Sequence, residues 1–218
     1  MTLLELSNIS YIVKDKSIIC DVSLSVNQGD YITIVGPSGS GKSTLLKLCS
    51  DLISPTSGTI TYNGRPLTAI DPESYRKEVG YCFQRPYLFA KTVRHNILFP
   101  YDIRGLEPDM SRIEYLFDLL HMPLNYMERR NDELSGGEMQ RICLIRSLIF
   151  EPNVLLLDEV TSALDATNTS IVEHVIDELH KKGITIISIT HNEEQSLRTA
   201  NRRITIVDGQ LAKEEVLR

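Results

Sequence analysis

One eight-residue stretch decides the fold, and it reads Gly36-Pro37-Ser38-Gly39-Ser40-Gly41-Lys42-Ser43. It fits the phosphate-loop pattern G-x-x-x-x-G-K-S/T at every position. The apolar run at residues 31–35 predicts a buried strand before the loop, and residues 44–48 predict the start of a helix after it. In that setting, glycines let successive backbone N–H groups face one concavity at a helix N-terminus, which favours phosphate. The loop is therefore predicted to bind the phosphates of a nucleotide.

Two side chains of the loop carry further chemistry. Lys42 would place a positive charge on the β- and γ-phosphates, and Ser43 would supply an oxygen ligand for Mg²⁺. A Gly-Ser surface loop with an incidental lysine is the plainer alternative. The full match between a strand and a helix favours phosphate binding.

A second apolar run, residues 154–157, ends in Asp158 and Glu159. An uninterrupted apolar run is typical of a central parallel strand that is covered on both faces. Asp158 is then placed to hold Mg²⁺ through water, and Glu159 to polarise an attacking water molecule. A strand that simply ends in polar residues is the alternative. Adjacent acids at a strand end are costly without a cation or substrate, so we expect a functional role.

The third informative stretch is Leu134-Ser135-Gly136-Gly137-Glu138. Ser135 and Glu138 fit a capping box ahead of a helix, which is a structural role in itself. Two glycines in a first helical turn nevertheless lower stability by roughly 1 kcal/mol each relative to alanine. Such glycines make sense where something must approach the backbone closely, and a helix N-terminus is a second anion site. We infer that both anion sites bind one nucleotide, each site coming from a different subunit.

The bulk properties narrow the class of protein. The chain has 218 residues and alternates apolar runs with helical stretches, which predicts a mixed α/β sheet. Its net charge of −6 provides no basic face for nucleic acid. The four cysteines show no C-x-x-C pairing and suit a reducing cytosol, and the five histidines show no paired spacing for a transition metal. No apolar run approaches the ~18 residues of a membrane-spanning helix.

Taken together, these stretches resemble the ATP-binding cassette (ABC) ATPase family over the whole chain. Residues 36–44, which end with Thr44, are similar to its Walker A motif, and residues 134–138 are similar to its signature. Residues 154–159 are similar to its Walker B motif, with Glu159 as the catalytic glutamate.

Four further residues match family motifs in family order. Asp165 ends a Ser-Ala-Leu-Asp stretch that resembles the D-loop, and Gln84 resembles the Q-loop glutamine. His191 follows an apolar strand at residues 184–189 and resembles the switch histidine, while Tyr11 resembles the aromatic residue that stacks on adenine. Ordinary strand packing for the tyrosine, and solvated polar positions for the glutamine and the histidine, are the alternatives.

The resemblance implies an α/β fold of the P-loop NTPase (RecA-like) type. This fold has a core with a mixed sheet, an N-terminal antiparallel β subdomain and an inserted α-helical signature subdomain. Residues 1–218 would form a single ABC ATPase domain. Its core would comprise about residues 1–84 and 152–218, and its helical subdomain about residues 85–151.

The resemblance also implies a mechanism, in which ATP is hydrolysed in a head-to-tail homodimer that the nucleotide bridges. ATP would be bound by residues of all these motifs: Tyr11, Gly36, Pro37, Ser38, Gly39, Ser40, Gly41, Lys42, Ser43, Thr44, Ser135, Gly136, Gly137, Glu138 and Asp165. Mg²⁺ would be held by Ser43, Asp158 and Gln84. Glu159 would act as the general base or orient the water, Gln84 and His191 would sense the γ-phosphate, and Asp165 would couple the two sites.

In function, the chain resembles the ATPase subunit of a membrane transporter, so the membrane part would be a separate integral permease. The subunit would be cytoplasmic and peripheral on the inner face of the cell membrane. A dense group of aromatic residues within 81–101 could form a groove for a helix of that partner, or part of the core. A DNA-repair ATPase of the superfamily is disfavoured because sustained heptads are lacking, and a translation ATPase because only one phosphate loop is present.

Finer similarity points to the small bacterial ATPases assigned to iron export, through stretches such as residues 52–59 and 86–100. Metal or amino-acid importers and peptide or lipid efflux systems carry nearly the same motifs and stay open. Glu138 replaces the glutamine that is more frequent in the family, and Val160 replaces a frequent proline. Such an ATPase contacts ATP and a coupling helix rather than the cargo, so the motifs do not define the transported substrate.

Overall fold

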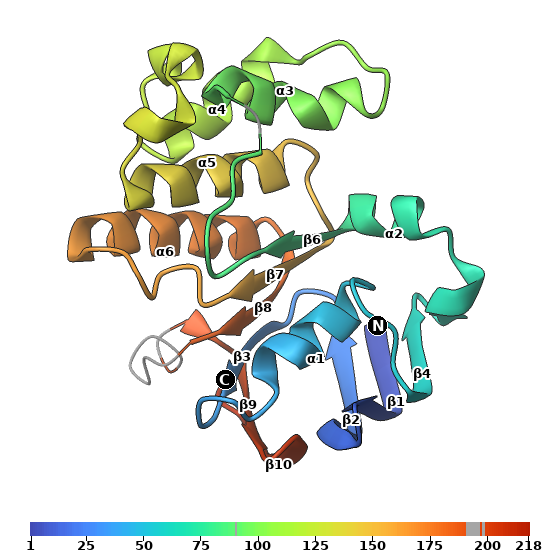
Figure 1. Ribbon diagram of the computed structural model, residues 1–218. Helices are drawn as coiled ribbons and strands as arrows, with labels where there is room; N and C mark the ends of the chain where they lie inside the picture. Colours follow the sequence, from blue (N-terminus) through green and yellow to red (C-terminus); the bar gives the residue numbers. More distant parts are fainter. Residues whose placement is uncertain (90, 191–196, 198) are drawn as a thin grey trace. The chain divides into compact units, whose positions relative to one another are not determined.

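The computed structural model (Figure 1) describes residues 1–89, 91–190, 197 and 199–218. The chain divides into two compact units. The first unit comprises residues 1–81, 152–159 and 180–218, and the second comprises residues 82–151 and 160–179. The division into core and helical subdomain at 84/85 and 151/152 stays a prediction.

The first unit contains a four-stranded antiparallel sheet with the strand order β2-β1-β4-β5. Its strands are β1 (Thr2–Val13), β2 (Lys16–Asn27), β4 (Ser57–Tyr62) and β5 (Arg65–Pro66). The end of β2 shows why this sheet has one dry face: Val22, Leu24 and Val26 are buried and alternate with exposed Ser23 and Ser25.

The first unit also contains a six-stranded sheet with the order β10-β9-β3-β8-β7-β6. Its strands are β3 (Tyr31–Val35), β6 (Val79–Cys82, the last residue of which belongs to the second unit), β7 (Val154–Asp158), β8 (Thr185–Ile189), β9 (Arg202–Val207) and β10 (Gln210–Val216). Strand β3 runs parallel to β8 and β9, β7 runs parallel to β8, and β9 and β10 are antiparallel. The sheet is mixed, as predicted.

Helix α1 (Lys42–Cys49) connects the two sheets, because it contacts β2 of one and β7 and β8 of the other. It buries Leu45, Leu46 and Leu48 in a hydrophobic cluster that draws residues from both sheets. The short elements η1 (Leu67–Ala69) and α2 (Pro72–Glu78) lead from β5 to β6.

The parallel strands bring their carboxyl ends to one edge of the six-stranded sheet. Ile189 at the end of β8 pairs in register with Ile34 of β3 on one side and with Asp158 of β7 on the other. Segments that follow such strands form the usual ligand-binding edge of open α/β sheets. The phosphate loop after β3, Asp158 and Thr190 therefore gather at this edge.

The second unit is helical. It holds α3 (Val93–Asp102), α4 (Met110–Leu119), η2 (Leu124–Glu128), η3 (Asn131–Glu133), α5 (Gly136–Leu148) and most of α6 (Ala166–Lys181). Helix α5 contacts α3 and α4, and the fully buried side chains of Ile97, Phe117 and Ile145 show where this unit has its core. Among the residues that the structure describes, no helix combines the length and the apolar character needed to cross a membrane.

Candidate active site

Two glycines of the phosphate loop are required by close neighbours. Gly36 has φ +140°, and a Cβ atom there would lie 2.0 Å from the backbone oxygen of Ile206 in β9. Gly41 has φ +101°, and its Cβ would lie 2.7 Å from the backbone oxygen of Ile18 in β2. Any side chain at either position would therefore collide with backbone, in a conformation that L-residues rarely adopt. The loop therefore packs closely against β9 of one sheet and β2 of the other.

The side chain of Lys42 lies inside this loop. Its Nζ donates hydrogen bonds to the backbone oxygens of Gly36 (3.0 Å) and Pro37 (2.8 Å), and the residue is only 5% exposed. Burial lowers the pKa of Lys42 from its usual value, and the negative charges of Glu159 and Asp158 oppose that shift. These two hydrogen bonds thus hold the ammonium group within the loop, where phosphate oxygens would be in reach.

Asp158 is fixed by two hydroxyl groups. The Ser43 Oγ donates to Asp158 Oδ1, and the Tyr81 hydroxyl donates to Asp158 Oδ2, both over 2.8 Å. Asp158 is 5% exposed and ends β7, so both its side chain and its backbone are constrained.

These oxygen donors fit Mg²⁺, which keeps several waters and is bound by one or two carboxylates together with substrate phosphates. In the part of the chain that the structure describes, no three His, Cys, Asp or Glu side chains gather into a metal cage. A divalent cation held by Ser43 and Asp158 would therefore depend on the phosphates of a nucleotide for its remaining ligands. When bound, Mg²⁺ would neutralise charge on those phosphates.

Glu159 adopts a left-handed backbone conformation with φ +48° directly after β7. This conformation disfavours a glutamate by about 1–2 kcal/mol, and such strained residues cluster at functional sites. Its side chain is half-buried, and its charge acts on Lys42.

Tyr11 of β1 lies one strand away from the phosphate loop. Its register partner in β2 is Ile19, and the Ile19 Cδ1 atom would be 2.8 Å from a Cβ on Gly41. Tyr11 is half-buried against the hydrophobic cluster of the first unit. The structure thus places Tyr11 near the loop, while stacking on adenine stays a prediction.

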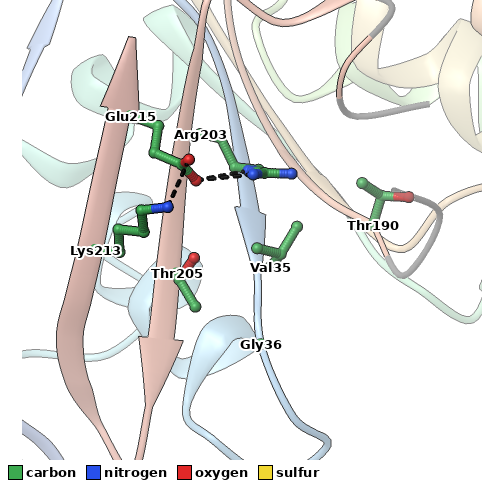
Figure 2. A pocket seen from close by; sticks show the side chains of 7 residues that line it. All are labelled: Val35, Gly36, Thr190, Arg203, Thr205, Lys213 and Glu215. Atoms are coloured by element: carbon green, nitrogen blue, oxygen red, sulfur yellow. Dashed lines mark hydrogen bonds and ion pairs between the residues drawn. The ribbon is translucent and has the colours of Figure 1, made fainter. Parts of the chain in front are cut away.

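Figure 2 shows a pocket of about 370 Å³ in the first unit. It is lined by Val35, Gly36, Thr190, Arg203, Thr205, Lys213 and Glu215. Glu215 pairs with both Arg203 (2.8 Å) and Lys213 (2.7 Å), so one carboxylate is shared between the two cations of the lining. Lys42 and Asp158 do not line it, so the pocket meets the phosphate loop only at Gly36, the first residue of the loop.

In the second unit, the signature stretch begins helix α5. Ser135 is the N-cap, and its Oγ accepts from the Glu138 backbone N–H at 3.3 Å. The Glu138 Oε2 in turn accepts from the Ser135 backbone N–H at 2.7 Å. The capping box that the sequence predicts is confirmed.

The Glu138 carboxylate is also held from outside the helix. The Tyr126 hydroxyl donates to its Oε1 at 2.7 Å, and Arg129 lies 3.8 Å from the same atom. Burial alone would raise the pKa of Glu138, but the hydrogen bonds from Tyr126 and Ser135 outweigh it and keep this pKa below its usual value.

The two signature glycines have different surroundings. A Cβ on Gly136 would meet nothing within 4 Å, whereas a Cβ on Gly137 would lie 2.8 Å from Asn168 Nδ2. Asn168 is held there by Asp165, because its backbone N–H and its side-chain Nδ2 donate to the two Asp165 oxygens at 2.8 Å each. Gly136 thus leaves the helix N-terminus open, and Gly137 makes room for the chain's own Asn168.

The predicted site residues divide between the two units. The first unit holds Tyr11, residues 36–44, Asp158 and Glu159, and the second holds Gln84, residues 135–138 and Asp165. Gln84 is exposed at a bend that follows β6. His191 lies outside the described residues.

Two residues, one in each unit, contact predicted site residues but were not themselves identified from the sequence. Tyr81 appeared there only as one of several aromatic residues, although its position on a strand next to β7 decides its contact with Asp158. Asn168 was missed, although an asparagine three positions after Asp165 is a usual partner of such a turn. Both contacts depend on how separate elements pack, and the sequence around each residue does not reveal that packing.

Together, the strand–loop–helix at residues 31–49 and the Ser43–Asp158 pair define a P-loop nucleotide-binding protein. A model of the family described as "ABC transporter" matches residues 19–162, well over half of the chain. The chain therefore belongs to the ABC transporter family, as an ATP-binding subunit with ATPase activity.

Curated relatives cover nearly the whole chain. The probable iron export ATP-binding protein FetA of Escherichia coli K12 is 42% identical, over 94% of this chain and 91% of the relative. The lipoprotein-releasing system ATP-binding protein LolD 1 of Chlorobium chlorochromatii is 38% identical, over 93% of this chain and 85% of the relative.

Among solved structures, the ATP-binding cassette MJ0796 in a dimeric post-hydrolysis state bound to ADP and Pi superposes with a TM-score of 0.89. The two sequences are 26% identical, and the match covers 99% of each chain. The fold is thus that of ABC ATPase cassettes, and the dimeric state of this cassette supports a homodimer for the present chain.

Proposed function

We propose that this chain hydrolyses ATP with Mg²⁺ in a head-to-tail homodimer, and that hydrolysis drives transport through a separate integral membrane permease. The observation that carries the proposal is the hydrogen bond from Ser43 Oγ to Asp158 Oδ1, next to the buried Lys42. These three side chains supply the charge and the oxygen ligands that a magnesium-bound triphosphate needs.

The second anion site supports the head-to-tail arrangement. Gly136 opens the N-terminus of α5, where backbone N–H groups and the helix dipole attract phosphate. In the proposed dimer, ATP lies between residues 36–44 of one subunit and Ser135, Gly136 and Gly137 of the other. The γ-phosphate then favours the closed dimer, and hydrolysis releases it.

The remaining site residues take the roles that their motifs predict. Glu159 is the general base or orients the attacking water, in line with its strained backbone beside Asp158. Gln84 and His191 sense the γ-phosphate, with Gln84 as a further ligand of Mg²⁺. Asp165 couples the two sites.

The permease would dock on aromatic side chains of the second unit. Of the six aromatic residues within 81–101, Tyr101 is buried and Tyr81 is half-buried, whereas four are exposed: Phe83, Tyr87, Phe89 and Phe99. Exposed apolar patches commonly mark interaction sites, and Tyr87 is as much as 68% exposed. A helix of the permease that docked on this surface would bury these rings.

Part of this exposed aromatic surface is held in place by contacts within the second unit. The rings of Phe89 and Phe99 pack edge-to-face with centroids 4.4 Å apart. Arg146 of α5 covers the Phe89 ring at 4.8 Å and donates through Nη2 to the Tyr87 backbone oxygen at 3.0 Å. A preorganised surface lowers the entropy lost on docking, which supports its use as an interface.

The transported substrate is proposed by similarity. The relative FetA suggests export of iron or another metal, and the chain would then act at the inner face of the cell membrane. LolD keeps open a role in lipoprotein release. Co-expression of this chain with the proposed permease tests the docking surface.

In that experiment, Tyr87→Ser should abolish co-purification with the membrane protein and leave the ATPase activity of the isolated chain unchanged. Tyr115→Ser, which alters an exposed aromatic residue of α4 outside the 81–101 segment, is the matched control. Retention of the complex by Tyr87→Ser would count against this surface. A deletion strain that tolerates excess iron like the parent strain would count against iron export.

A further inference from the structure

We propose that Tyr81 is a positioning residue that sets the orientation of the Asp158 carboxylate for Mg²⁺ binding. The inference rests on the proposed function, because it concerns the metal site assigned to Ser43 and Asp158. It adds a residue that belongs to neither the phosphate loop nor the carboxylate motif.

The geometry places the Tyr81 hydroxyl on the far side of the carboxylate from Ser43. Tyr81 lies on β6, the strand next to β7 in the sheet, and Asp158 is the last residue of β7. The Tyr81 hydroxyl donates to Oδ2 and the Ser43 hydroxyl donates to Oδ1, each over 2.8 Å. Each oxygen of the carboxylate therefore has its own donor.

The Tyr81 ring is itself fixed. It is half-buried and packs against the hydrophobic cluster that joins the sheets of the first unit. A hydroxyl on a packed ring can hold its acceptor in one orientation, as a mobile surface side chain cannot. Hydrogen bonds to an ionised acceptor are also roughly twice as strong as neutral ones.

Loss of this donor should therefore loosen the carboxylate. Without the hydroxyl, Asp158 Oδ2 would have to find water, and the carboxylate could rotate about its bond to Cβ. That rotation would break the alignment of Ser43 Oγ, which depends on Asp158 Oδ1. Residues that orient metal ligands typically change metal affinity by 10–100-fold when they are replaced.

The test is the Tyr81→Phe variant, which keeps the ring and removes only the hydroxyl. Binding of Mn²⁺ in the presence of ADP is measured by electron paramagnetic resonance, so the readout does not depend on turnover. We expect the Mn²⁺ affinity to fall about 10-fold. Nucleotide affinity without metal should stay unchanged, and the Mg²⁺ concentration for half-maximal ATPase activity should rise in parallel.

Tyr62→Phe is the matched control. The Tyr62 hydroxyl also donates to a carboxylate of the first unit, Glu78 Oε2 at 2.8 Å, but Glu78 has no part in the metal site. This variant should bind Mn²⁺ as the wild type does, even if its stability is lower. A Tyr81→Met variant, which fills the space without a hydroxyl, should reproduce the loss seen with Tyr81→Phe.

Wild-type Mn²⁺ affinity in either Tyr81 variant would overturn the positioning role. Asp158→Asn separates this failure from failure of the proposed metal site. If Asp158→Asn binds Mn²⁺ weakly while Tyr81→Phe binds it normally, only the inference about Tyr81 fails. If Asp158→Asn binds Mn²⁺ as the wild type does, the metal site itself is wrongly assigned.

Discussion

Ser43 and Asp158 are separated by 115 positions in the sequence, yet the Ser43 Oγ donates a hydrogen bond to the Asp158 Oδ1 over 2.8 Å. The contact joins the first turn of α1 to the end of β7. It brings two distant motifs together at the carboxyl edge of the sheet, which is the arrangement that the proposed Mg²⁺ site requires.

This contact makes Ser43→Ala informative. The change removes the proposed oxygen ligand of Mg²⁺ and the hydrogen-bond donor to Asp158, so ATPase activity at limiting Mg²⁺ should fall about 10–100-fold. Nucleotide binding in the absence of metal should be nearly unchanged, as measured by fluorescence titration. Ser50→Ala, which loses a hydrogen bond to the Lys47 backbone oxygen at the other end of α1, is the control and should keep its metal dependence. If Ser43→Ala required the same Mg²⁺ concentration as the wild type, Ser43 would not be a ligand of the metal.

Glu159→Gln should uncouple nucleotide binding from hydrolysis. The amide cannot accept a proton from water, so turnover should fall about 10²–10⁴-fold. ATP should still drive dimer formation, which light scattering after size-exclusion chromatography would detect. Glu73→Gln, at an exposed site in α2, should leave both properties intact. Normal turnover by the Glu159 variant would show that another group activates the water.

The two signature glycines predict opposite effects on the isolated chain. Gly136→Ala has open space and should stabilise α5 by about 0.5–1 kcal/mol, yet it should weaken ATP-driven dimerisation. Gly137→Ala should gain less or lose stability, because Asn168 must move away from its contact with Asp165. Urea unfolding and dimerisation assays measure both quantities. If Gly136→Ala dimerised with unchanged ATP dependence, the open helix terminus would have no role in closure.

The capping glutamate predicts a pH dependence. Because the pKa of Glu138 is lower in the folded chain than its usual value of 4.5, its ionised form stabilises the folded state. This stabilisation is complete above the unfolded-state pKa and disappears as the pH falls through the lower folded-state pKa.

Glu138→Gln keeps an acceptor for the capping box but does not titrate. When urea unfolding is repeated from neutral pH to about pH 3, the free energy of unfolding of the wild type should therefore fall relative to that of Glu138→Gln. Glu138→Ala keeps the Ser135 cap but loses the acceptor for the Ser135 backbone N–H and the Tyr126 hydroxyl, and it should be about 1 kcal/mol less stable at neutral pH. A pH-independent difference between the wild type and the glutamine variant would contradict the assigned interactions.

Local patterns predict the central elements of the fold well. The expected strand at residues 31–35 is β3, and the run at residues 154–157 lies in β7, because a strand buried on both faces must be continuously apolar. The capping box at Ser135 is likewise found where its spacing predicts it.

Local sequence patterns did not predict the contacts between elements. The hydroxyl of Tyr81 reaches Asp158 only because β6 and β7 are neighbours in the sheet, and strand order is not written in either strand. In the same way, the two glycines of the signature look alike in the sequence. Packing of Asn168 over Gly137 alone distinguishes them.

The left-handed backbone at Glu159 has a consequence for protein engineering. Glu159→Gly would relieve about 1–2 kcal/mol of conformational strain, of which the greater backbone entropy of glycine in the unfolded chain would offset roughly 0.5–1 kcal/mol. A library screened only for heat resistance should accordingly enrich this substitution and discard the carboxylate. Selection for thermal stability and selection for turnover would thus favour different residues at position 159. A directed-evolution experiment on this chain would need to measure both properties.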